Sequence, residues 1–294
     1  MLDLSIVIVS YNTRELLRSC LNSIYASQGD FGYEVSVVDN CSHDNSATMV
    51  RDEFPQVRLI VSETNNGYAW ANNQGLRHST GRYVLLLNPD TLLPPDALQG
   101  MLDFMDSHPQ AGATGPQLVR EDGSLDLACR RSFPSPEVSV YRMVGLSKLF
   151  PKNRRFARYN LTFLSPDEVT EVDSVVGAFM MVRREAMEQV GLLDENFFLY
   201  GEDLDWAYRI KQAGWKIYYN PQVTVLHYKR EATKQNRLKA RYEFYRSMYL
   251  FHQKHYARNI PFWLNWLIFG GIVLCGGISL LGEMRPTLSR RAAK

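Results

Sequence analysis

Apolar positions in the first third of the chain come in short runs that alternate with longer amphipathic segments. Four runs of five to seven residues predict buried strands, over Leu4–Ser10, Glu34–Val38, Val57–Val61 and Tyr83–Leu87. The segments after them have helical spacing, over Thr13–Ser27, Asp44–Phe54, Tyr68–Ser79 and Pro94–Ser107. This alternation predicts right-handed βαβ units, and so an α/β fold with a mostly parallel sheet flanked by helices.

Three of the predicted strands end in a polar tip. These tips are Tyr11-Asn12, Asp39-Asn40 and Asn88-Pro89-Asp90. Because the carboxyl ends of parallel strands meet at one edge of a sheet, where open α/β sheets bind ligands, we expect a nucleotide cleft there. Asp90 can hold a divalent cation that in turn holds a diphosphate. The same stretch is also compatible with a core strand that ends in an Asx turn.

The regular pattern ends after a further possible strand at 111–119. Residues 120–170 are irregular, with basic and aromatic side chains in Arg130-Arg131-Ser132-Phe133-Pro134 and basic ones in Lys152-Asn153-Arg154-Arg155. We interpret this stretch as an inserted loop region, which is either a solvated charged loop or a lid or acceptor-binding surface.

Periodic segments return in the second half. They predict a buried strand over Gly177–Val182, a short helix over Arg184–Val190, and strands over Trp215–Asn220 and Val223–Leu226 that lead to His227. Apolar residues at 204, 207 and 210 mark an amphipathic helix. Its first turn carries the acidic cluster Glu202-Asp203-Leu204-Asp205, where the helix dipole favours negative charge.

The last segment combines a basic helical stretch, 229–258, with an apolar run of 20 residues over Phe262–Leu281. Twenty helical residues just span a bilayer core of about 30 Å. The pairs Gly270-Gly271 and Gly276-Gly277 favour a bend or close helix packing, and basic residues flank the run on both sides. A spanning helix, a helix lying in the membrane interface and a helix packed on a partner protein are all compatible with this pattern.

Charge is distributed unevenly along an otherwise ordinary globular composition. The 294 residues carry a net charge of +2, but the part from Tyr228 onward holds 13 basic and 3 acidic residues, against 20 and 28 in the remainder. Such a basic tail is typical of proteins that bind an anionic membrane surface or nucleic acid. The apolar run that follows it favours the membrane as the partner, and we expect no binding of nucleic acid.

The cysteines and the N-terminus point to a reducing compartment. Cys20, Cys41, Cys129 and Cys275 are scattered without a C-x-x-C pair, which predicts neither a zinc site nor a disulfide framework. The first residues lack the basic region of a signal peptide. We therefore expect a cytoplasmic body.

Asp90, the acidic cluster at 202–205 and His227 are the candidates for a reaction centre. Asp90 and His227 together suit Mg²⁺ or Mn²⁺, whose other positions diphosphate oxygens can fill. A separate carboxylate, Asp203, is then available to take a proton from an attacking hydroxyl. The structural alternatives are a core histidine for His227 and helix capping for Glu202 and Asp203.

The order of these motifs resembles inverting glycosyltransferase family 2, which has the GT-A fold, and in particular its bacterial rhamnosyltransferase-like members. The matching stretches are Ser5–Asn12, Val37–Asn40, Asn65–Gly75, Asn88–Asp90, Gly177-Ala178, Gly201–Asp203 and His227.

Asn88-Pro89-Asp90 stands where the family has its D-x-D motif, with Asn in place of the first acid, so Asp90 alone remains as the motif's metal ligand. Gly201-Glu202-Asp203 resembles the E-D motif, which implies Asp203 as catalytic base, with Glu202 beside it as the other catalytic residue. His227 falls where members carry a further metal contact. The resemblance also implies a donor pocket in which Asp39 hydrogen-bonds the pyrimidine base, formed by Tyr11, Asn12, Asp39, Asn65, Gly67, Asn73 and Asn88.

The resemblance implies direct displacement at the anomeric carbon with inversion and no covalent intermediate. It implies a pyrimidine nucleotide sugar, best matched by dTDP-L-rhamnose, and a lipid-linked saccharide or polysaccharide acceptor at the cytoplasmic membrane face. The Q-x-x-R-W signature of processive synthases is missing after His227, which favours single-sugar addition. A non-catalytic nucleotide-sugar-binding scaffold, supported by Asn88, is the alternative. A nucleotidyltransferase would need a glycine-rich phosphate loop, which Ser10-Tyr11-Asn12-Thr13 does not provide.

The expected organisation follows from these assignments. Residues 1–228 form a GT-A domain with a nucleotide-binding half, 1–119, and an acceptor-binding half, 120–228, that contains the irregular insert 120–170. Residues 229–294 form a basic and hydrophobic helical extension associated with the membrane.

Overall fold

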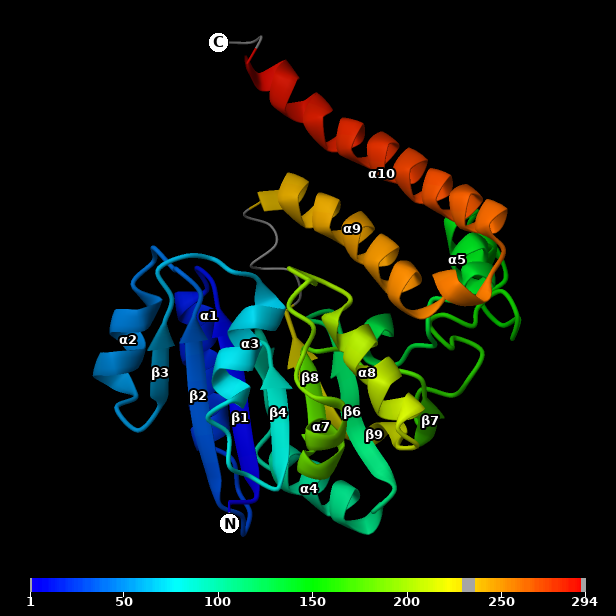
Figure 1. The fold of residues 1–294 in the computed structure, drawn as a ribbon. Coiled ribbons are helices and arrows are strands. Elements are labelled where there is room, and N and C mark those ends of the chain that lie inside the picture. Colours follow the sequence, from blue (N-terminus) through cyan, green and yellow to red (C-terminus); the bar gives the residue numbers. More distant parts are fainter. Residues whose placement is uncertain (1, 229–235, 292–294) are drawn as a thin grey trace.

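The computed structural model describes residues 2–228 and 236–291, and in the last helix it describes side chains as far as Glu283. A nine-stranded sheet runs through the body in the order β3-β2-β1-β4-β8-β6-β9-β5, with β7 paired to β9 (Figure 1). Residues 229–235 of the predicted helical stretch 229–258 lie outside the described residues.

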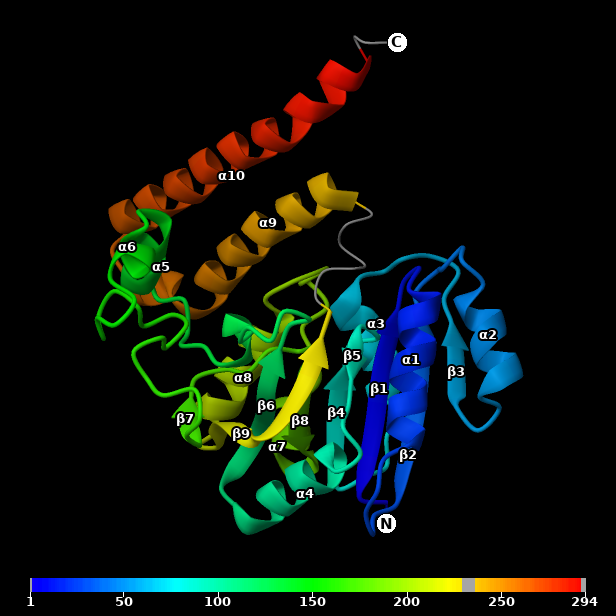
Figure 2. The same cartoon turned by 180° about the vertical axis from the view of Figure 1, so that it is seen from behind.

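The parallel half of the sheet follows the predicted alternation. Strands β1 (Leu4–Ser10), β2 (Tyr33–Asp39), β3 (Arg58–Val61) and β4 (Tyr83–Leu87) are mutually parallel. Strands β1 and β4 are buried along their whole length, because helices cover both faces of the sheet: α3 (Tyr68–Leu76) lies on one face and α1 (Arg14–Tyr25) on the other (Figures 1 and 2).

The second half of the sheet is mixed. Strand β8 (Phe179–Arg183) runs antiparallel between β4 and β6 (Ala111–Val119), and β9 (Lys216–His227) is parallel to β6. Two short strands, β7 (Thr170–Val172) and β5 (Thr91–Leu92), pair antiparallel with the beginning and the end of β9.

Strand β9 corrects the prediction of two separate strands at 215–220 and 223–226. It is one strand with an irregular stretch, because Asn220 pairs with Pro116 whereas Gln117 pairs with Thr224. Pro221 lies inside this stretch, where its missing N–H removes no ladder hydrogen bond.

The remaining helices of the body are close to their predicted positions. They are α2 (Ser46–Glu53), α4 (Ala97–Ser107), α7 (Arg184–Val190) and α8 (Glu202–Gln212). The insert contains the short helices η1 (Leu127–Cys129), α5 (Pro136–Met143) and α6 (Leu146–Leu149), and is otherwise irregular.

One part of the insert differs from a solvated charged loop. Arg130 and Arg131 are only 2% and 7% exposed. Arg130 donates to the carbonyls of Leu164 and Ser165, so it holds two parts of the insert together. The solvated-loop interpretation is therefore wrong for this arginine pair, although it describes Arg154 and Arg155, which are exposed.

The C-terminal extension is a helical pair above the carboxyl edge of the sheet. Helix α9 (Arg237–His255) is followed by the turn η3 (Ala257–Asn259) and by α10 (Phe262–Arg291), which lies alongside α9 (Figures 1 and 2). The segment Phe262–Glu283 is long and apolar enough to cross a membrane, with a mean hydropathy of 2.0, and 11% of its most apolar 18-residue stretch is buried. This is consistent with membrane association.

Candidate active site

Asp90 and His227 meet because of the register between two strands. Strand β5 begins directly after Asp90, and its Thr91 is paired with His227, the last residue of β9. The backbone N–H of Tyr228 also donates to the Asp90 carbonyl at 2.9 Å. The two buried side chains consequently face each other, with Asp90 Oδ1 3.3 Å from His227 Nε2.

Asp126 approaches the other side of the His227 ring. Its Oδ2 lies 3.2 Å from His227 Nδ1, and the Asp126 side chain is fully buried. Burial disfavours the imidazolium, but the hydrogen bond that its Nδ1–H donates to Asp126 and the interaction with the Asp90 carboxylate outweigh burial and raise the pKa of His227 to about 9. A carboxylate on Nδ1 fixes the ring orientation and leaves Nε2 directed toward Asp90.

The Asp90–His227 pair fits a hard divalent cation. Asp90 Oδ1 and His227 Nε2 are both buried, face each other at 3.3 Å and have no other partner in the described part of the chain, so a cation held by both residues would take the place of the His227 Nε2 proton. One carboxylate oxygen and one imidazole nitrogen suit Mn²⁺ or Mg²⁺. Among the described residues, no group of three or more His, Cys, Asp and Glu side chains is arranged for a metal.

Asp203 lies in the first turn of α8 and is held by three hydrogen bonds. Its Oδ2 accepts from Arg131 at 2.7 Å and from the Gly177 N–H at 2.9 Å, and its Oδ1 accepts from the Leu204 N–H. Arg131 is anchored in turn by the Val175 carbonyl at 2.7 Å. A carboxylate has about four acceptor positions, so one remains for a substrate hydroxyl.

Glu202 is buried beside Asp203 but in a different state. Its Oε2 has no hydrogen-bond partner. Burial, and then the neighbouring Asp203 carboxylate, raise the pKa of Glu202 well above its usual range. Two adjacent acids thus differ in their surroundings: Asp203 is held by three hydrogen bonds, whereas burial and the neighbouring acid favour the neutral form of Glu202.

A short series of hydrogen bonds connects Asp203 with the end of β4. The Tyr68 hydroxyl donates to Asn88 Oδ1 at 2.8 Å and lies 3.2 Å from the Gly177 carbonyl, while the Gly177 N–H donates to Asp203. The Asn88 N–H also donates to the Ala178 carbonyl. The backbone N–H and the side-chain oxygen of Asn88, two residues before Asp90, are therefore held by the protein, and its contact with a donor stays a prediction.

The predicted donor residues at the ends of β1 and β2 are tied together. The Asn12 N–H donates to Ser42 Oγ, and its Oδ1 accepts from the His43 N–H. Asp39 Oδ2 accepts from the Ser42 N–H, whereas its buried Oδ1 has no partner. Tyr11 follows β1 and is half-buried, and a pocket of about 370 Å³ lined by residues that include Asn12 and Asp44 opens beside it.

Asn65 and Gly67 shape the turn before α3. Asn65 Oδ1 accepts from Asn40 and from the Gly67 N–H, both at 3.1 Å. Gly67 has φ +94°, and a Cβ there would lie 2.6 Å from the Phe198 carbonyl oxygen. Only glycine fits this close approach, which brings the loop before α8 next to α3.

Asn73 is placed differently from the other predicted donor residues. Its amide Nδ2 donates to the Leu193 carbonyl and to Glu195, and its Oδ1 accepts from the Leu193 N–H. Asn73 therefore holds the loop that leads to α8, and its contact with a donor stays a prediction.

Asp126, Arg131 and Tyr68 are site residues that reasoning from the sequence missed. Asp126 and Arg131 lie in the irregular insert, where no periodic pattern indicates burial. The one available signal was the aromatic and apolar company of Arg130-Arg131, which is unusual for a solvated loop. Tyr68 belonged to a recognised helix, but its hydroxyl partner is fixed only by the approach of β8 to β4.

Comparison with known proteins identifies relatives of this chain. The profile described as "Glycosyl transferase family 2" matches residues 5–191. The chain is 28% identical to N-acetylglucosaminyl-diphospho-decaprenol L-rhamnosyltransferase of Mycobacterium tuberculosis, over 98% of this chain and 96% of that protein. It is 26% identical to rhamnosyltransferase WbbL of Escherichia coli, over 76% of this chain and 82% of that protein.

Solved structures with the same fold include two glycosyltransferase complexes. The mannosyltransferase PcManGT from Pyrobaculum calidifontis, in complex with GDP-Man and Mn²⁺, aligns with a TM-score of 0.57 at 20% identity, over 100% of this chain and 78% of that one. GalNAc-T7 with UDP, GalNAc and Mn²⁺ aligns with a TM-score of 0.57 at 17% identity, over 77% of this chain and 44% of that one. The sheet and its helices thus form a GT-A fold.

Proposed function

Because the chain belongs to glycosyl transferase family 2, we propose that it transfers single L-rhamnose units from dTDP-L-rhamnose to a lipid-linked or polysaccharide acceptor. Support for the sugar comes from two rhamnosyltransferase relatives, at 28% and 26% identity. Support for a lipid-linked acceptor comes from the name of the mycobacterial relative and from the apolar α10. The proposed location is the cytoplasmic face of the membrane.

The observation that carries the proposal is the grouping of two separate functional centres at one sheet edge. Asp90 and His227 would hold a divalent cation, and Asp203 lies on the far side of the Tyr68–Asn88 contact. When bound, the cation supplies charge stabilisation for a departing diphosphate. We propose that Asp39 and the tips of β1 and β2 bind the nucleotide, and their position at the carboxyl ends of neighbouring parallel strands supports this.

In the proposed reaction, the acceptor oxygen forms a bond to the anomeric carbon as the bond from that carbon to the diphosphate oxygen breaks. The proton of the acceptor hydroxyl passes to Asp203 Oδ1, which has remaining acceptor capacity. Arg131 and the Gly177 N–H hold Asp203 in position and balance its charge. Glu202, as a protonated acid, is proposed to donate a hydrogen bond within the site.

Asp203→Asn tests the base. Turnover is expected to fall by about a hundredfold to ten-thousandfold, because proton removal contributes to the transition state, while dTDP-L-rhamnose binding changes little. Transfer to a short-chain prenyl-diphospho-N-acetylglucosamine, measured beside donor binding by calorimetry, checks both. Asp122→Asn, at an exposed aspartate, is the matched control. Near-normal turnover in Asp203→Asn would assign the base elsewhere.

Asp90→Ala tests the cation site. The variant is expected to lose the part of dTDP affinity that depends on Mn²⁺ and to keep the metal-free affinity, because it removes one of two protein ligands. Titrations with and without Mn²⁺ give both values.

A screen of donors tests the alternative of a non-catalytic scaffold. If purified protein neither hydrolyses nor transfers any of the dTDP-, UDP- and GDP-sugars with Mn²⁺ or Mg²⁺ present, the scaffold replaces the transferase as the proposed function.

A further inference from the structure

We propose that α10 and the α5–α6 segment form one apolar docking surface that lies in the plane of a single membrane leaflet, with α10 parallel to the membrane. The membrane partner is that of the proposed function, on which this inference rests. The occupant is a bilayer containing anionic phospholipids.

Helix α10 has a broad apolar face that the described part of the protein does not cover. Its large side chains there are between 55% and 77% exposed: Phe262, Trp263, Trp266, Leu267, Val273, Leu274, Ile278 and Leu281. An apolar patch of this extent is far larger than soluble monomers usually expose. Trp263 and Trp266 near the start of the helix are residues that favour the membrane–water interface.

The α5–α6 segment extends this face beyond α10. Val140, Met143, Val144, Leu149 and Phe150 are between 43% and 70% exposed. The Met143 side chain reaches α10, because a Cβ added at Gly271 would lie 3.7 Å from the Met143 Cε. Figures 1 and 2 both show α5 against the first half of α10. An insert in the body and the C-terminal helix thus contribute to the same surface.

Helix α10 is held on α9 along its apolar length. Asn265 lies 2.7 Å from His252 Nε2, the Phe269 ring lies 5.4 Å from that of Tyr249, and Gly276 packs on the Tyr245 ring. At the far end, Glu283 pairs with Arg241 at 2.9 Å. These contacts follow one antiparallel register.

Helix α9 is polar and is fastened to the body. Lys254 pairs with Asp194 at 2.6 Å, His255 lies 2.7 Å from Asp205, and Arg246 donates to the Asn196 carbonyl. A helix with this many charges cannot enter a hydrocarbon core. For α10 to span the membrane it would have to leave α9 and carry Glu283 away from Arg241. An in-plane position keeps every contact and buries only the apolar face.

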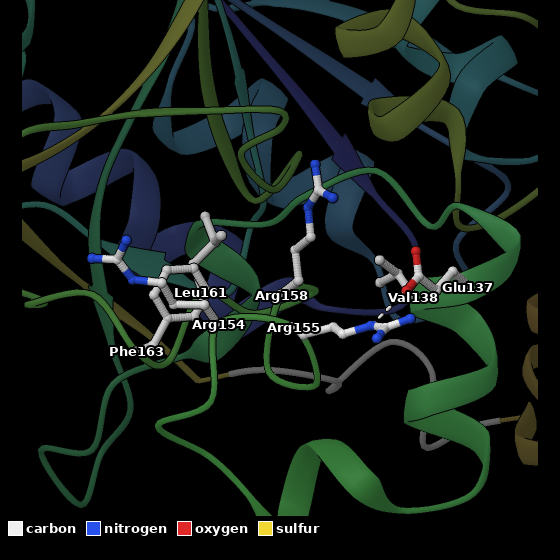
Figure 3. A pocket seen from close by; sticks show the side chains of 7 residues that line it. All are labelled: Glu137, Val138, Arg154, Arg155, Arg158, Leu161 and Phe163. Carbon is white, nitrogen blue, oxygen red and sulfur yellow. Dashed lines mark hydrogen bonds and ion pairs between the residues drawn. The ribbon is translucent and has the colours of Figure 1, made fainter.

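Basic groups lie next to the apolar surface. A pocket of about 440 Å³ opens beside α5 and is lined by Arg154, Arg155 and Arg158 (Figure 3). Arg155 points to Glu137, with which it pairs at 2.9 Å, while Arg154 and Arg158 extend away from that acid. Anionic headgroups would lie at this level when the apolar side chains enter the acyl region, and each nearby basic residue strengthens the attraction.

Binding to vesicles of phosphatidylglycerol and phosphatidylcholine tests the shared surface. Val144→Glu and Leu149→Glu are each expected to weaken vesicle binding by about tenfold or more. In each variant an anion replaces an apolar side chain that would be buried in the membrane of the bound state. Val61→Glu is the matched control: Val61 is 53% exposed but lies on β3, at the far end of the sheet from α5 (Figure 1). Equal binding of all four proteins would overturn the role of α5–α6.

The depth of α10 tests its orientation. Leu267, Leu274 and Leu281 lie seven residues apart on one face and are similarly exposed, and they span about 21 Å of helix. A fluorophore is attached to a single cysteine at each position in turn, in a protein with Cys41 and Cys275 replaced by serine. Lipids that carry quenchers at known depths then report how deep each fluorophore lies in the bilayer. Equal shallow depths are expected. A label at 274 near the bilayer centre with shallow labels at 267 and 281 would establish a spanning helix and overturn the proposal.

Failure of the docking surface and failure of the proposed function are distinguishable. Val144→Glu is expected to keep full transfer to the short-chain acceptor, which needs no membrane, and Asp203→Asn is expected to keep vesicle binding. Loss of vesicle binding in Asp203→Asn, or of short-chain transfer in Val144→Glu, would show that the surface and the site are not independent and would overturn the docking assignment.

Discussion

At the scale of single residues, buried polar atoms without partners coincide in part with the predicted site residues. Seven such side-chain atoms occur on the described residues, and four belong to Asp39, Asp90, Glu202 and His227, which were predicted to act in the site. Proteins normally satisfy buried polar groups, so a bound ligand would complete the facing pair Asp90 and His227. Asp203 is the contrasting case, since the protein itself holds it in a fixed orientation.

Asp126 is a positioning residue by this reasoning, because it touches His227 and not the reacting atoms. Asp126→Asn is expected to lower Mn²⁺ affinity by about 10- to 100-fold, since His227 would lose the carboxylate that orients its ring. Electron paramagnetic resonance of free Mn²⁺ during titration measures the affinity without turnover. The exposed Asp122→Asn controls for charge. Unchanged Mn²⁺ affinity in a folded Asp126→Asn protein would leave Asp126 with a structural role only.

At the scale of elements, α8 joins the site to the C-terminal helices. Asp203 faces Arg131 and Gly177, while Asp205, in the same first helical turn, accepts from Arg209 and lies within 2.7 Å of Lys254 and His255 of α9. Burial would raise the pKa of Asp205, but its hydrogen bond with His255 and the charges of Arg209 and Lys254 lower it to about 2. The helix that carries the proposed base is therefore bound by ion pairs to α9 of the C-terminal helical pair.

The Asp205 cluster makes this connection sensitive to acid. A carboxyl with a depressed folded-state pKa stabilises the fold above its unfolded pKa, near 4, and loses that stabilisation as the pH falls toward 2. The expected contribution at neutral pH is about 2 kcal/mol. Urea unfolding of the wild type and Asp205→Asn at several pH values between 7 and 2 measures it. The stability gap between the two proteins should shrink toward pH 2, and a gap independent of pH would contradict the assignment.

At the scale of the whole molecule, the net positive charge and most of the exposed large apolar side chains lie in the C-terminal extension. The acidic part before Tyr228 holds the sheet and the site, and the basic helical pair lies above the carboxyl edge of the sheet (Figure 1). A membrane bound by α10 would therefore face the same end of the molecule as the strand tips. This arrangement suits an acceptor that is delivered from a lipid surface.

Shortening the chain to end at Arg258 is expected to remove membrane binding and to leave nucleotide binding in place. The chain should move from the membrane to the soluble fraction, because the main apolar face is removed, while dTDP binding should persist, because α10 packs chiefly on α9 and not on the sheet. Sedimentation with vesicles and calorimetry measure the two properties. Equal membrane partition of the full and shortened chains would rule out α10 as the anchor.

The sequence alone determined the parallel half of this protein and named most of its candidate site residues. Apolar runs report burial directly, so β1, β2, β3 and β4 and the helices between them could be read from local periodicity. Parallel strands also bring their carboxyl ends to one edge, which was sufficient to group Asp39 with Asp90. The E-D cluster at the start of a helix was equally local.

Only the tertiary structure decided which groups meet across distant segments. The antiparallel direction of β8, the single strand β9 and its pairing of His227 with Thr91 depend on strand register, which periodicity does not encode. Burial of Asp126 and Arg131 depends on how an aperiodic insert folds over the sheet edge. The in-plane position proposed for α10 likewise follows from its contacts with α9, because an apolar run of 20 residues has the same length whether it crosses a membrane or lies on it.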